Sequence, residues 1–127
     1  GLFTPLHTNA EIAVIVNLTN NDTLDKSQIK KIFLGKLKRF PSGSQTVAIT
    51  QKASSKTRTE FDKKVLKKSA SQLKAYWSKL LFTGKGQPPK EVLNDAEMLE
   101  LVASNPNMIG FIDASSVSDT VKVIAKL

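Results

Sequence analysis

The sequence predicts an α/β fold in which helices flank a central mixed or parallel sheet. Residues 12–16 form a near-continuous run of apolar, mostly β-branched side chains, which is typical of a strand buried on both faces. Further strand-like segments follow, separated by stretches with apolar residues at helical spacing. This alternation favours a sheet with parallel neighbours. A chain of 127 residues with 40% apolar content can bury one hydrophobic core.

The first part of the chain predicts two strands and one well-delimited helix. The first strand covers residues 11–17, and a polar turn follows it. Asp25 and Gln28 form a capping-box pattern at the start of the helix, and Gly35 is placed to end it. A turn that contains proline and glycine then leads to a short second strand at residues 47–49.

The middle of the chain predicts two consecutive helices. Ser55 is expected to cap the first, and Ser69 with Gln72 repeats the capping-box pattern before the second. Residues 83–89, TGKGQPP, break the second helix. Trp77 lies at helical spacing with several leucines, which favours packing in the core over a role as a stacking platform for bases.

The last part predicts a helix at residues 95–104 and two strands at residues 108–113 and 121–127. Residues 11–127 are therefore expected to form a single domain. Residues 1–10 are expected to be an N-terminal extension or a tag remnant, and they show no secretory signal pattern. No apolar run has the length of about 18 residues that a membrane span requires.

Positive charge is concentrated in the middle of the chain. The formal net charge is +8, and residues 26–90 contain 17 lysines or arginines but only two acidic residues, Glu60 and Asp62. Such a block attracts phosphate, sulfate, nucleic acid or an acidic lipid surface. The alternative interpretation is a lysine-rich face that is simply solvated, because lysine is mostly exposed in any protein.

The sequence predicts a protein that is not an enzyme, because it contains no recognisable set of catalytic residues. The only histidine is His7, and cysteine is absent. The carboxylates are scattered without the spacing of an acid–base pair. No cluster of His, Asp and Glu indicates a metal site, so no catalytic residue, metal or cofactor is expected.

The best candidate for a binding site is the segment from Ser54 to Arg58, which joins an expected strand to an expected helix. With Ser55 as the N-cap, the N–H groups of Lys56, Thr57 and Arg58 have no intrahelical partner, and such a helix start attracts anions. The hydroxyls of Ser54, Ser55 and Thr57 add polar groups. The Arg58 guanidinium is shaped to bind two oxygens of one oxyanion.

The order of the segments resembles the phosphate-type substrate-binding proteins of ABC transporters, a branch of the type II periplasmic-binding-protein fold. The matching stretches are IAVIVN at residues 12–17, LDKSQIKKIFLGK at 24–36, SSKTRTEF at 54–61, KAYWSKLLFTGKGQPP at 74–89, NPNMIGFIDA at 105–114 and VKVIAKL at 121–127. Together these stretches run through most of residues 11–127 in one consistent order.

The resemblance implies a site and a location. In that family a Ser-Gly-Thr-Arg turn at a helix start grips phosphate, and Ser55, Thr57 and Arg58 match its serine, threonine and arginine. Lys56 stands where the family has glycine. The resemblance also implies a bacterial, periplasmic or secreted solute-binding protein or sensor whose signal peptide has been removed, and a phosphate-like oxyanion as its ligand.

The resemblance covers a single lobe of a family whose members have two. Two other functions therefore remain open. The lobe could be a degenerate module that self-associates or docks on another secreted or membrane protein without a ligand. The positive charge alone would also suit a nucleic-acid or anionic-surface binder, which is disfavoured because the basic residues carry no recognised nucleic-acid motif.

Overall fold

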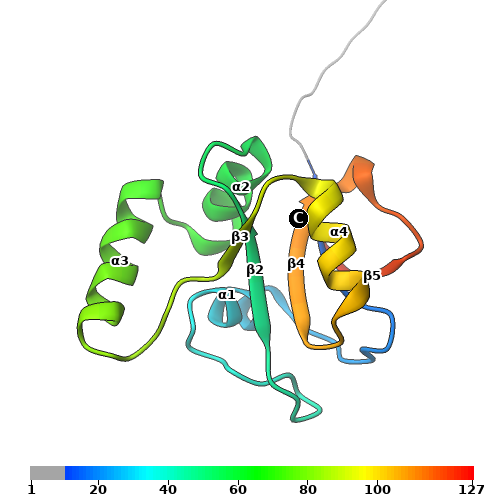
Figure 1. Ribbon diagram of the computed structural model, residues 1–127, viewed down its shortest axis with the longest axis horizontal. Helices are drawn as coiled ribbons and strands as arrows, with labels where there is room; N and C mark the ends of the chain where they lie inside the picture. The colour runs from blue at the N-terminus through cyan, green and yellow to red at the C-terminus, as the bar shows by residue number, and fades with distance from the viewer. Residues whose placement is uncertain (1–10) are drawn as a thin grey trace, which may run out of the picture.

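The computed structural model describes residues 11–127. Its centre is a five-stranded mixed sheet of order β3-β2-β4-β1-β5, and Figure 1 shows β3, β2 and β4 side by side. The strands are β1 (Ile12–Asn17), β2 (Val47–Gln51), β3 (Lys90–Val92), β4 (Met108–Asp113) and β5 (Val121–Lys126). The expected N-terminal extension, with His7, lies outside the described residues. The predicted α/β class with a mixed sheet and flanking helices is confirmed.

The central strand β1 explains why residues 12–16 are apolar without interruption. It pairs antiparallel with β4 on one side and with β5 on the other, whereas β2 runs parallel to both β3 and β4. Alternate residues of β1 enter separate cores: Ile12, Val14 and Val16 face one, and Ala13 and Ile15 face the other. Both cores are covered by helices, so no face of β1 meets water.

The helices cover the two faces of the sheet unequally. The larger core receives α1 (Lys26–Phe33), α2 (Lys56–Phe61) and α3 (Ala70–Phe82), and the smaller core receives α4 (Asp95–Ser104). Phe61 of α2 stacks on Phe111 of β4 with ring centroids 4.0 Å apart and meets Phe33 of α1 edge-on at 4.7 Å. This aromatic cluster fixes α1 and α2 against the sheet. No helix within residues 11–127 combines the length and the apolar character needed to cross a bilayer.

The start and stop signals in the sequence act as predicted. Capping boxes are present at Asp25 with Gln28 and at Ser69 with Gln72, and each pair exchanges side-chain and backbone hydrogen bonds. Gly35 has a φ of 74°, the left-handed conformation that ends α1. Trp77 is 9% exposed, which confirms its assignment to the core.

Three local features of the structure are not predicted by the sequence pattern. Strand β3 is only three residues long and begins with Lys90 and Glu91, so it carries no apolar alternation. A π-helical turn, η1 (Asp62–Leu66), extends α2 and ends at Lys67, whose φ is 57°. A short 3-10 turn, η2 (Ala114–Ser116), follows β4. The first two of these features border the sites described below.

We predict that Gly110→Ala destabilises the protein by about 1–3 kcal/mol, because the added methyl group would overlap the buried sulfur of Met98. Urea unfolding at fixed pH measures the change. Gly86→Ala is the matched control, since a methyl group there meets only ordinary van der Waals contacts. In the presence of Met98→Ala, the Gly110→Ala substitution should lower the free energy of unfolding much less. If the two substitutions instead have additive effects on the free energy of unfolding, the steric explanation is wrong.

Candidate functional site

Two helices begin beside one hollow at the carboxyl ends of the parallel strands. Ser55 caps α2 just beyond the end of β2, and Asn94 caps α4 just beyond the end of β3. The hollow has a volume of about 410 Å³. Its lining comes from both helix starts and from the end of β2: Gln51, Lys52, Ser55, Thr57, Leu93, Asn94, Asp95 and Ala96. In open α/β sheets, ligands bind at this edge.

The Ser55 hydroxyl both caps α2 and binds the end of β2. It accepts a hydrogen bond from the Arg58 backbone N–H at 3.1 Å, as predicted for an N-cap. It donates its single proton to Oε1 of Gln51 at 2.6 Å. Ser55 therefore builds the hollow, and its hydroxyl proton is already committed.

The Gln51 side chain forms hydrogen bonds to several elements at the base of the hollow. Its amide nitrogen donates to Oδ1 of Asp95 at 2.6 Å and to the carbonyl of Phe111 at 3.3 Å. The other oxygen of Asp95 accepts from the backbone N–H of Asp113 at 3.2 Å and from the Ser116 hydroxyl at 2.7 Å. The ends of β2, β4 and α4 are thus held in one network, which fixes the two helix starts relative to each other.

The donors that remain available at the start of α2 come from the next two residues. Among the described residues, the N–H groups of Lys56 and Thr57 and the Thr57 hydroxyl have no recorded hydrogen-bond partner. Lys52 and Lys56 are exposed and add positive charge nearby. Ser54 is also exposed, and neither Ser54 nor Lys56 lines the hollow. The arrangement can donate hydrogen bonds to a small anion.

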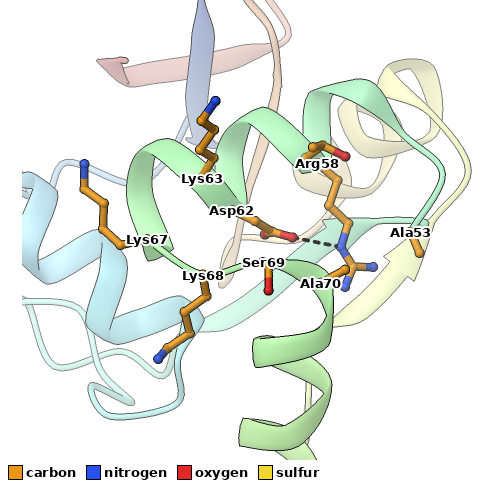
Figure 2. A pocket seen from close by; sticks show the side chains of 9 residues that line it. Ala53, Arg58, Asp62, Lys63, Lys67, Lys68, Ser69 and Ala70 are labelled. Carbon is orange, nitrogen blue, oxygen red and sulfur yellow. Dashed lines mark hydrogen bonds and ion pairs between the residues drawn. The ribbon is translucent and has the colours of Figure 1, made fainter.

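The Arg58 side chain forms its own set of contacts at the end of β2. Its Nη1 donates to the carbonyl of Gln51 and to Oε2 of Glu91, both at 2.9 Å, and its Nε donates to Oδ2 of Asp62 at 3.4 Å. Arg58 lines a second pocket, drawn in Figure 2, and does not line the hollow at the helix starts. Through the Gln51 carbonyl it connects the end of β2 to α2.

Asp62 is an acid whose environment disfavours its charge. Its side chain is 9% exposed, and burial raises the pKa of Asp62 to about 6, outweighing the opposing effects of the Arg58 charge and hydrogen bond. No group of three or more His, Cys, Asp or Glu side chains within residues 11–127 is arranged to hold a metal ion.

Sequence reasoning missed Gln51, Asn94 and Asp95. Gln51 closes a strand, and Asn94 precedes a helix in the pattern of an N-cap, so each has a local signal. The contact between Gln51 and Asp95 spans 44 positions in the sequence. No local pattern reveals such a contact.

Comparison with known proteins gives a consistent result. The model of the PBP superfamily domain matches residues 8–127. An ABC-type phosphate transport receptor from Vibrio cholerae is similar in structure, with a TM-score of 0.71 and 25% identity over 91% of this chain and 46% of the other. No curated protein shows significant similarity to the chain.

Two further solved structures share the fold. One is a putative phosphate ABC transporter substrate-binding protein with bound phosphate from Clostridium perfringens, with a TM-score of 0.67 and 22% identity over 91% of this chain and 45% of that one. The other is PstS from Borrelia burgdorferi, with a TM-score of 0.65 and 16% identity over 91% and 47%. The chain thus spans slightly less than half the length of the structures that it matches.

We predict that Asp62→Asn gains stability over the wild type as pH rises. Because the folded pKa lies above the unfolded value of 3.8, ionising Asp62 weakens the wild-type fold between these two values, and the asparagine variant escapes this loss. The difference in unfolding free energy between variant and wild type should grow by about 2–3 kcal/mol from about pH 4 to about pH 7. Urea unfolding across this range measures it, and a constant difference would contradict the raised pKa.

Proposed function

Because the chain belongs to the PBP superfamily, we propose that it is a solute-binding lobe that takes a phosphate-like oxyanion at the start of α2. The observation that carries the proposal is the hollow where α2 and α4 begin, with donors at Lys56 and Thr57 that form no hydrogen bond within residues 11–127. Support comes from the fold neighbours, one of which is named as a phosphate transport receptor and another as holding bound phosphate.

The residues from Ser54 to Arg58 have distinct proposed roles. Thr57 donates its hydroxyl and its backbone N–H to the oxyanion, and Lys56 contributes a backbone N–H and a nearby positive charge. Ser54 contributes polar surface at the rim. Ser55 and Arg58 position these donors, Ser55 through its cap and its bond to Gln51, and Arg58 through the Gln51 carbonyl. No covalent step is involved, so the protein is a binding protein and not an enzyme.

The proposed setting follows from the family. A PBP-type lobe that collects phosphate or a similar ion would serve an ABC transporter, as a solute-binding component or as a sensor, in the periplasm or outside the cell. The net charge of +8 would raise the local concentration of the anion near the hollow.

One observation favours a second candidate function, a module that binds another protein or a second copy of itself. Leu93 is 59% exposed in the wall of the hollow, and Val117 is 39% exposed after η2, at the same end of the sheet. A partner commonly covers such side chains where they form one contiguous apolar patch. Sedimentation over a range of concentrations tests this candidate: association that Leu93→Ser weakens would favour it, and a monomer at high concentration would exclude self-association.

We predict that Thr57→Val weakens phosphate binding by roughly 10-fold or more, because a hydrogen bond to a charged group contributes about 1.5–3 kcal/mol. Calorimetric titration of inorganic phosphate into dialysed protein, with sulfate as competitor, measures the affinity. Thr23→Val is the matched control, because Thr23 is exposed and lies outside the hollow. Equal affinity for the Thr57 variant and the wild type would remove this site from consideration.

A further inference from the structure

A second pocket of about 530 Å³ lies between the π-helical turn η1 and the start of α3. Figure 2 shows Asp62 and Lys63 on one side of it and Ser69 and Ala70 on the other. Its volume falls within the range of pockets that hold small organic molecules, about 300–1,000 Å³, and exceeds what an inorganic oxyanion requires. The wall is mostly carbon and includes the methyl groups of Ala53 and Ala70.

Irregular backbone creates this pocket. The helix that begins at Lys56 widens into a π-turn over Asp62–Leu66, and Lys67 then adopts a left-handed conformation with φ of 57°. This conformation costs energy for a residue with a side chain, and both features occur preferentially at functional sites. The chain reverses at Lys67 and starts α3 after Ser69, and the pocket lies between these two helical segments.

Unbalanced positive charge surrounds the opening. Lys63, Lys67 and Lys68 line the pocket, and their side chains extend outward from the ribbon around it (Figure 2). Between Asp62 and Glu91 the sequence contains eight lysines and no acidic residue. Among the described residues, neither Lys63 nor Lys67 forms an ion pair.

The acid at the base of the pocket does not cancel this charge. Asp62 is paired with Arg58, whose remaining contacts to Gln51 and Glu91 hold it in place. The rim therefore attracts anions, whereas the wall favours apolar groups. A ligand that satisfies both parts carries a negative head and an apolar body.

We propose that this pocket binds a small organic anion with an apolar body, such as an alkyl carboxylate. The carboxylate lies at the rim beside the ammonium groups of Lys63 and Lys67, and the alkyl chain lies against Ala53 and Ala70. The Lys68 ammonium, 5.5 Å from the centre of the Tyr76 ring, adds positive charge at the other side of the rim. The proposal does not depend on phosphate binding at the start of α2, because the two pockets share no lining residue.

The test is calorimetric titration of octanoate into the full chain, below the concentrations at which octanoate forms micelles. We expect one saturable site. Octanol, which lacks the charge, and acetate, which lacks the alkyl chain, should each bind about tenfold more weakly or worse. Absence of saturable octanoate binding would overturn the proposal, as would binding only to vesicles that contain phosphatidylglycerol.

Two kinds of variant locate the site. Ala70→Trp fills the pocket and should abolish octanoate binding, whereas Ala75→Trp, at an exposed position on the same helix, should leave it unchanged. The double variant Lys63→Ser, Lys67→Ser should weaken octanoate binding by about tenfold or more. If Ala70→Trp fails to fold, the affinity of this double variant for octanoate is the deciding measurement. Octanoate binding that survives these changes would overturn the proposal. Thr57→Val should leave octanoate binding intact, which separates this test from that of the proposed function.

Discussion

The hydrogen bonds at the end of β2 determine how the functional edge is built. The Gln51 side chain binds the cap of α2, the first residue of α4 and the carbonyl of Phe111, and the Gln51 carbonyl accepts from Arg58. Without this residue, two helix starts and two strands would meet with buried polar groups unpaired, which is costly in a low-dielectric site. The hollow exists because these groups satisfy one another and still leave the first N–H groups of α2 facing outward.

Arg58 lines only the second pocket, but it also contacts Gln51, which lines the first hollow. One nitrogen holds the end of β2 beside the first hollow, and another holds Asp62 at the base of the second. The sequence alone suggests that an arginine in this position grips an anion directly. In the folded chain its Nε and Nη1 are engaged by the Gln51 carbonyl and by two carboxylates, and direct contact between Arg58 and an anion stays a prediction.

Local signals in the sequence were sufficient for most of the fold, because caps, turns and apolar spacing act over a few residues. The capping boxes at Asp25 and Ser69 and the stop at Gly35 are of this kind, and so is the cap at Ser55 that locates the candidate site. Features set by distant partners were not predictable. Strand β3 exists because β2 offers it an edge, and Asp95 joins the site only through contacts with Gln51 and β4.

The position of β1 also bears on how the chain folds. Its pairing partners are β4 and β5, the last two strands within the described residues, and the backbone N–H of Ile12 donates to the carbonyl of Leu127. During synthesis, the apolar strand β1 therefore emerges before both of its partners and stays unpaired until β4 and β5 have followed. Pairing over such sequence separations is slow, and an unpaired apolar strand is prone to aggregation. A chaperone that shields β1 until β5 is complete would thus act on the step at which this fold is most vulnerable.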